Sequence, residues 1–141
     1  MKRSRQLASL SRDHHQALAI ALRLRRADDD TAEQAQSAFL EFWRSHGREH
    51  FRAEEEILLP AFAGHGDSHH PLVLRALGDH VAIRHRADRI ATAAAPPALL
   101  HELGERLAAH VRFEEWELFP LVEQTLPPDA LAAVAAALEA A

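Results

Sequence analysis

The stretch HFRAEEEILLP begins at His50, and the stretch HVRFEEWELFP begins at His110, sixty residues later. The two stretches are identical at six of eleven positions, which hold His, Arg, Glu, Glu, Leu and Pro. Packing of a helix bundle alone would repeat apolar residues, so the repeated polar residues indicate chemistry. Upstream of each copy, DHHQALAIALRLRR from Asp13 resembles DHVAIRHRADRI from Asp79. We therefore interpret the chain as one two-helix unit that is used twice.

The composition favours an all-α protein. Ala, Leu, Arg and Glu are abundant, whereas Gly totals 5 and Tyr is absent, and this balance is typical of helices rather than strands. A chain of 141 residues is expected to form a single domain, residues 1–141, with its core at about 5–125. The absence of Cys excludes disulfides and thiolate metal sites.

Charge and hydropathy exclude two classes of partner. The net charge of −5 provides no basic surface for nucleic acid. No apolar run approaches the roughly 18 residues that a membrane span requires. We therefore expect a cytoplasmic protein that binds neither nucleic acid nor membranes.

Apolar periodicity and turn residues predict four long helices and a short one. The predicted ranges are about 4–27, 31–63, 71–95, 97–126 and, for the short C-terminal helix, 129–140. Short connections favour an up-down-up-down antiparallel four-helix bundle, and the last helix would cap one end or contact a partner chain. Thr31 and Gln34 form a predicted capping box, and Pro60 is expected to bend its helix or free the carbonyl of Glu56.

Polar side chains interrupt the apolar face of each long helix. His50 and Glu54 are four residues apart and so share one helix face. His110 and Glu114 repeat this spacing, and single histidines lie on the apolar faces of the first and third helices. Six candidate metal ligands are therefore expected to meet in one core: His14, His50, Glu54, His80, His110 and Glu114.

Burying these groups without compensation would cost several kcal/mol per ion. A pair of metal ions provides that compensation, because carboxylates can bridge two metals while imidazoles fill the remaining positions. Nitrogen and oxygen donors without sulfur suit iron, manganese or zinc. Two bridging glutamates and two histidines per metal would leave open positions where a small molecule such as dioxygen could bind. The Glu-x-x-His pairs of ferritin-like di-iron bundles do not occur in the chain.

The doubled His-x-x-x-Glu motif, together with the histidines of RDHH and GDH, resembles the hemerythrin-like, or HHE cation-binding, domain family over about residues 5–125. The resemblance implies a four-helix bundle around two iron ions in a non-haem, oxo- or hydroxo-bridged centre. Glu54 and Glu114 would bridge the metals, and His50 and His110 would be terminal ligands. The implied partner is dioxygen, another diatomic molecule or peroxide.

One position departs from the oxygen carriers of this family. Invertebrate carriers have a second histidine one turn after the third-helix ligand, and Arg84 stands there in this chain. Water, a carboxylate shift, His15 or His46 could supply the missing ligand. We expect a metal- and oxygen-binding protein more than a dedicated enzyme. The alternatives are a di-iron enzyme that decomposes peroxide or nitric oxide, an iron-handling or sensing module acting through a partner, or a plain bundle that folds without metal. In each case the protein could form a homodimer.

Several neighbours of the candidate ligands are left with two interpretations. The apolar register favours His14 over His15 as the inward residue. His46, one turn before His50, is a substitute ligand, a partner that orients one, or an exposed histidine. Glu55 and Glu115 point off the ligand face, which indicates hydrogen bonding or surface charge. The aromatic residues beside the motifs, Trp43, Phe113 and Trp116, are expected to pack in the core.

Overall fold

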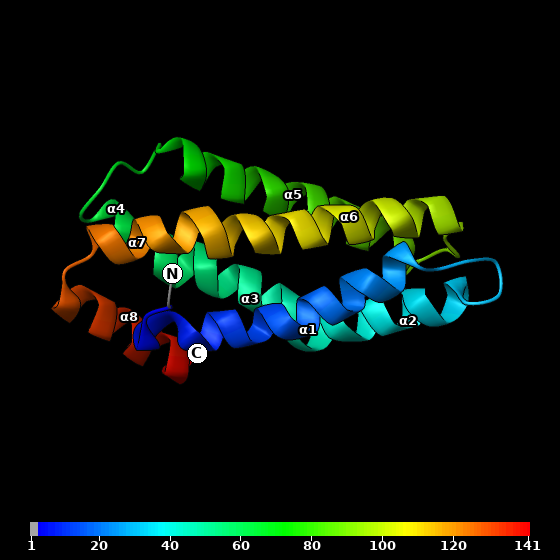
Figure 1. Ribbon diagram of the computed structural model, residues 1–141, viewed down its shortest axis with the longest axis horizontal. Coiled ribbons are helices and arrows are strands. Elements are labelled where there is room, and N and C mark those ends of the chain that lie inside the picture. The colour runs from blue at the N-terminus through cyan, green and yellow to red at the C-terminus, as the bar shows by residue number, and fades with distance from the viewer. Residues whose placement is uncertain (1–2) are drawn as a thin grey trace.

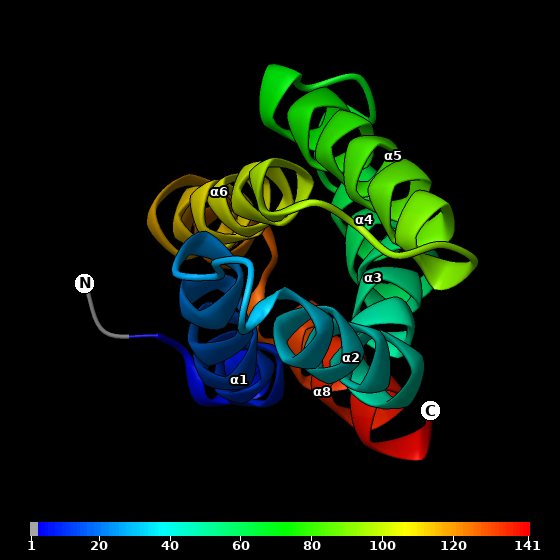
Figure 2. The same ribbon diagram turned by 90° about the vertical axis from the view of Figure 1, so that its right-hand side faces the viewer.

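The computed structural model describes residues 3–141, and all regular structure in this range is helical. The helices pack side by side as a bundle along one long axis (Figure 1) and surround a common interior (Figure 2). The first helical segment is α1 (Ala8–Arg25), after a short 3₁₀ turn at Arg5–Leu7. Of the four long helical segments, α5 (Pro71–Ala91) is the third along the chain. The short C-terminal helix is α8 (Pro128–Ala140). None of the helices in the described range is both long and apolar enough to cross a membrane.

The two segments that carry the repeated motif are continuous helical runs with π-helical interruptions. The first run consists of α2 (Ala32–Phe42), α3 (Arg48–Ala53) and α4 (Leu59–Ala63), joined by π segments at Trp43–Gly47 and Glu54–Leu58. The second consists of α6 (Pro97–Phe113) and α7 (Phe119–Thr125), joined by a π segment at Glu114–Leu118. Such π turns inside α-helices are frequent at functional sites.

In both copies of the motif a π segment ends two residues before the proline. The backbone N–H of Leu59 donates to the carbonyl of Glu54, and that of Phe119 donates to the carbonyl of Glu114. Pro60 and Pro120 follow one residue later and have no N–H to donate. The N–H that each proline lacks therefore falls directly after a backbone hydrogen bond that spans five residues instead of four.

The predicted capping box at the start of α2 is wrong. The Thr31 side chain makes no cap hydrogen bond to α2. Its hydroxyl instead donates to the Asp28 carboxylate at 3.0 Å and accepts the backbone N–H of Asp28, also at 3.0 Å. The Asp28 carboxylate accepts the backbone N–H groups of Asp30 and Thr31 as well. Thr31 still precedes α2, and its carbonyl accepts the N–H of Ala35, but the loop keeps its hydroxyl from capping the helix.

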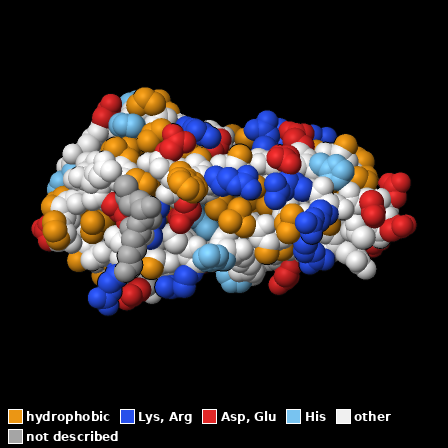
Figure 3. Space-filling model, viewed as in Figure 1, with side chains coloured by type: hydrophobic (Ala, Val, Ile, Leu, Met, Phe, Trp, Pro, Cys, Tyr) orange, Lys and Arg blue, Asp and Glu red, His pale blue; other side chains and the backbone are white. Residues whose placement is uncertain are grey.

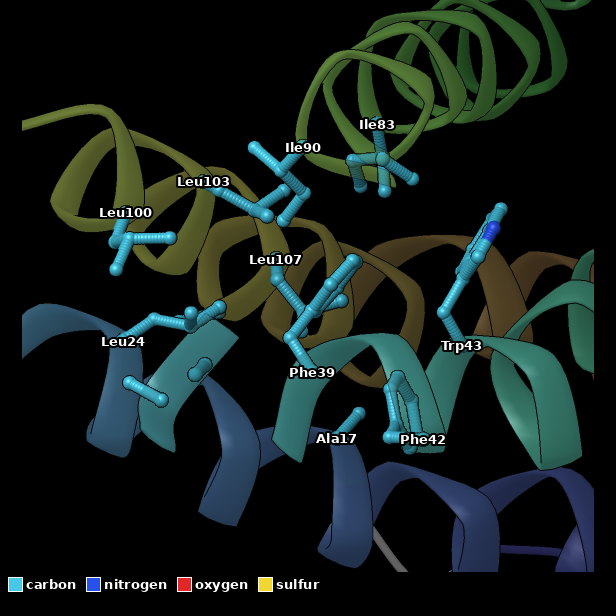
Figure 4. Close-up of a cluster of buried hydrophobic side chains, with 14 of the residues drawn as sticks. Ala17, Leu24, Phe39, Phe42, Trp43, Ile83, Ile90, Leu100, Leu103 and Leu107 are labelled. Atoms are coloured by element: carbon cyan, nitrogen blue, oxygen red, sulfur yellow. The ribbon is translucent and has the colours of Figure 1, made fainter. Parts of the chain in front are cut away.

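Two apolar clusters lie along the bundle. The first cluster includes Leu24, Phe39, Ile90, Leu100 and Leu103, whose side chains converge from different helices (Figure 4). The second cluster includes Leu7, Leu58, Phe62, Phe119 and Val122, together with Leu131 and Val134 of α8. The C-terminal helix therefore caps the bundle by packing on its own chain.

The residues of α1 show what lies between the two apolar clusters. Leu10 belongs to the second cluster and Ala17 to the first, and His14 lies between them. Trp43 and Phe113 are buried as expected, whereas the expectation for Trp116 is wrong, since 79% of it is exposed. The polar residues of the motif therefore occupy the middle of the bundle, with apolar packing on either side.

Candidate metal centre

All six candidate ligands are buried in the middle of the bundle: His14, His50, Glu54, His80, His110 and Glu114. Both glutamates are 0% exposed, and no other polar or charged side chain within residues 3–141 is classed as buried. Burial of two carboxylates is costly unless a positive charge compensates it. Figure 3 shows, by contrast, histidine side chains scattered over the surface.

The six side chains form two overlapping groups that could each hold a metal ion. The His14/His50 group contains those two histidines with Glu54 and Glu114. The His80/His110 group contains the other two histidines with the same two glutamates. Within each group the candidate ligand atoms all lie within 4.8 Å of one another. The shared glutamates make this a candidate dinuclear site.

Each glutamate presents one oxygen to each group. For Glu54, Oε2 lies 3.0 Å from His50 Nε2 and Oε1 lies 3.0 Å from His80 Nε2. For Glu114, Oε1 lies 2.9 Å from His14 Nε2 and Oε2 lies 3.2 Å from His110 Nε2. Neighbouring donors around one ion are roughly 3 Å apart when each metal–ligand bond is about 2.1 Å. If both groups held a metal ion, each glutamate would be placed to donate one oxygen to each ion.

The hydrogen bonding of the inward atoms tests whether the residues fit a metal. The buried atoms that make no hydrogen bond to any described residue include His50 Nε2, His80 Nε2, His110 Nε2, both oxygens of Glu54 and Oε2 of Glu114. Buried polar atoms in native proteins nearly always have a partner. These six unpartnered atoms all belong to the two groups, whereas His14 Nε2 and Glu114 Oε1 bind each other at 2.9 Å. So many unpartnered atoms in one buried cluster show that the residues fit a pair of metal ions.

Four further carboxylates bind the outward nitrogens of the histidines. The Nδ1 atoms of His50 and His110 lie 3.0 and 2.9 Å from Asp13 and Asp79. These contacts orient each imidazole so that Nε2 faces the interior, as carboxylates behind metal-bound histidines do. Neither aspartate was predicted as a site residue, although the repeated Asp-His dipeptide was a signal for both.

His14 and His80 are each oriented by a glutamate from the repeated motif, which lies on another helical run. His14 Nδ1 lies 3.2 Å from Glu115, and His80 Nδ1 lies 2.6 Å from Glu55. Of the two interpretations of these glutamates, the structure therefore supports hydrogen bonding to the histidines. Arg84 donates to both Glu55 oxygens at 3.1 Å and does not point into either group. His15 and His46 are exposed and belong to neither group.

The candidate ligands shift one another's pKa values. Burial by itself lowers the pKa of His110, but the Glu114, Asp79 and Glu54 carboxylates together outweigh burial and raise it to about 10. Burial likewise lowers the pKa of His80, and Glu114 and Glu54 raise it to about 9. Burial raises the pKa of Glu114, but His110, His14 and His50 together outweigh burial and hold this pKa well below its usual range. Without metal, the protonated forms of His80 and His110 are therefore favoured beside the ionised form of Glu114.

A pocket of about 20 Å³ adjoins the candidate centre. Its walls include His14, His50 and Glu114 from the groups, with Trp43 and Phe51 among the apolar residues. His110 of the other group also lines it, whereas His80 is stacked under Phe51 with ring centroids 3.8 Å apart. The pocket has room for about one water-sized molecule.

An all-helical bundle with two buried groups that share both carboxylates defines a candidate dinuclear metal-binding protein. The chain matches the family described as the Hemerythrin HHE cation binding domain over residues 6–122, and it belongs to that family. Neither a curated protein nor a solved structure was found to match the chain.

Proposed function

We propose that the chain binds two iron ions, one in each group, and that the loaded centre binds or senses dioxygen or a related small molecule. The observation that carries this proposal is the geometry of Glu54 and Glu114, which are fully buried and each offer one oxygen to each group. Iron, rather than manganese or zinc, is inferred from the family, since the donor types suit all three metals.

The residues of the chain determine what the centre can bind. Each group supplies two histidine nitrogens and two carboxylate oxygens, which leaves positions open on an ion that takes six ligands. Iron bound there would supply reversible electron transfer to a small ligand. The pocket beside the His14/His50 group is small and largely apolar, so it favours a neutral diatomic molecule over a hydrated anion. Asp13 and Glu115 hold the imidazoles of that group in orientation.

Arg84 favours a second candidate function, the decomposition of peroxide or nitric oxide. Where oxygen carriers of the family have an additional histidine, this chain has an arginine whose guanidinium binds Glu55. The His80/His110 group therefore has one histidine fewer, and an additional open position favours turnover of a bound molecule. Oxygen evolution from peroxide above the level of free iron, lost in Glu54→Ala, would identify this function.

We further infer that the chain is one domain, that its long helical runs form the up-down-up-down four-helix bundle of the family, and that the protein is cytoplasmic. In Figures 1 and 2 the four long runs lie side by side, and successive runs point in opposite directions, which supports this topology. A homodimer and action through a partner protein are further proposals. The apolar residues Leu131 and Val134 of α8 pack on the chain itself and so do not support a partner surface there.

Metal content per chain tests the proposal. The protein is purified without chelator, reconstituted anaerobically with ferrous iron, and measured by plasma mass spectrometry. We expect two irons per chain in the natural sequence and fewer in Glu54→Ala. Glu56→Ala is the matched control, because Glu56 is two residues away and exposed, and it should retain both irons. Exposure of the loaded sample to dioxygen should then produce new near-ultraviolet and visible absorption. A reproducible iron content near zero would refute the dinuclear centre.

A further inference from the structure

His46 takes no part in the candidate metal groups, yet it lies beside them. It is exposed, and it stands one turn before His50 on the π segment Trp43–Gly47. Its Nδ1 lies 2.8 Å from the hydroxyl of Ser45, the preceding residue. His46 also lines the small pocket over the His14/His50 group. In this structure His46 joins neither group and binds none of the candidate ligands, so its place at the pocket requires another explanation.

The burial of the lining residues shows where this pocket meets solvent. Asp13 and His46 are the two lining residues that are not buried. Ala17, Trp43 and Gly47, which also line it, are buried. The mouth therefore lies between α1, which carries Asp13, and the π segment, which carries His46.

The two sides of this mouth are held differently. The Asp13 carboxylate binds the Nδ1 atom of His50 at 3.0 Å, across two helices. The contact that holds His46 comes from Ser45 on its own helix, and the Ser45 hydroxyl in turn donates to the carbonyl of Glu41 at 2.7 Å. One side of the mouth is thus fixed by the candidate centre, whereas His46 can change rotamer without breaking a contact between helices.

We propose that small molecules enter the pocket between α1 and the Trp43–Gly47 segment, and that the His46 side chain sets the size limit at this entrance. As the route to a metal centre, the inference rests on the proposed function. The pocket of about 20 Å³ admits a molecule of the size of water or dioxygen. Removing the imidazole would widen the mouth and leave the groups that face the two candidate ions unchanged.

Trp43 provides a reporter inside the pocket. It lines the pocket and is 5% exposed, whereas Trp116 is 79% exposed. These are the two tryptophans of the chain, so Trp116→Phe leaves the fluorescence of Trp43 alone. In this full-length, metal-free background, quenching of Trp43 lifetime is measured with dissolved dioxygen and with the larger neutral quencher acrylamide.

The proposal predicts that dioxygen quenches Trp43 readily in the Trp116→Phe background and that acrylamide quenches it poorly. His46→Ala should increase the acrylamide quenching constant several-fold, with little change for dioxygen. His46→Phe, which fills the mouth, should decrease the constant for dioxygen. The matched control is His15→Ala, another exposed histidine on the wall of the bundle that does not line the pocket, and it should leave both constants unchanged.

Equal acrylamide constants for the background and His46→Ala, with both variants folded by circular dichroism, would overturn the proposal. An increase of the same size in His15→Ala would overturn it as well, because the effect would then be general loosening. Since the measurement needs no metal, its failure would remove the entrance and leave the dinuclear centre in place. Failure of iron binding would remove the dinuclear centre and leave the entrance to the pocket in place.

Discussion

Glu55 shows how a residue beside a candidate ligand shapes the centre without entering it. Its carboxylate lies between the Nδ1 atom of His80, at 2.6 Å, and the guanidinium of Arg84, at 3.1 Å. The His80 ring is thus held from behind, so its Nε2 keeps its direction toward the two glutamates. Glu115 holds His14 in the same way, although Ser11 at 2.8 Å replaces the arginine as the donor to this glutamate.

We expect Glu55→Ala to weaken metal binding about 10- to 100-fold, the usual effect of removing a partner behind a metal-bound histidine. The physical reason is that His80 loses the acceptor that fixes its ring orientation. Zinc affinity, measured by competition with a coloured chelator, tests this. Glu56→Ala is the control, because Glu56 pairs with the exposed Arg52 and faces solvent. Equal affinities of the two variants would show that Glu55 has no orienting role.

At the scale of helices, close approach between α1 and α6 depends on a glycine. A Cβ atom at Gly104 would lie 2.8 Å from the carbonyl oxygen of Ala21 and 2.9 Å from the Cβ atom of Leu24. Both contacts come from α1 itself rather than from the free end of a flexible side chain. The two helices carry His14 and His110, so their spacing also sets the spacing of the two groups.

Gly104→Ala should destabilise the protein by about 1–3 kcal/mol, because overpacking at this crossing outweighs the better helix propensity of alanine. Gly78→Ala is the matched control, since a Cβ atom at Gly78 in α5 would have no atom within 4 Å. That control should be stabilised by about 0.5–1 kcal/mol through helix propensity alone. Urea unfolding of both variants measures the two effects. A neutral or stabilising Gly104→Ala would contradict the close packing of these helices.

At the scale of the whole molecule, the polar centre lies between two apolar clusters and joins all four long helical runs. In the metal-free protein, folding raises the pKa of His80 to about 9 and that of His110 to about 10, since nearby carboxylates outweigh burial. The unfolded chain has ordinary histidines with pKa near 6.5. Between these values the folded state binds more protons than the unfolded state.

The metal-free protein should therefore lose stability as the pH rises from about 7 to about 10. The contribution of these histidines is fully present below about pH 6.5 and is lost as the pH passes their folded pKa values. Zinc-loaded protein should lack this loss, because a metal-bound histidine is already deprotonated. Zinc at 100 times its dissociation constant should also add about 2.7 kcal/mol to the free energy of unfolding. Thermal unfolding at a series of pH values checks both, and identical pH profiles with and without zinc would contradict the linkage.

Helices were predictable because their signals are local. The apolar spacing around His50 and His110, the prolines at helix starts and the scarcity of glycine each concern a few neighbouring residues. The π segments were not predicted, because a change in hydrogen-bond spacing leaves the apolar pattern nearly intact. The Thr31 capping box failed because Asp28, three residues earlier, offered the hydroxyl a competing partner.

The sequence by itself determined the all-helical class, the doubled motif and the inward face that carries the candidate ligands, since repetition and helical periodicity are properties of the chain order. Only the tertiary structure decided that each glutamate reaches both groups, that Asp13 and Asp79 bind the histidines from behind, and that His46 borders the pocket mouth while Trp116 faces solvent. The physical reason is that these relations join residues on different helices. Their distances depend on how the helices pack, and no spacing within one helix contains that information.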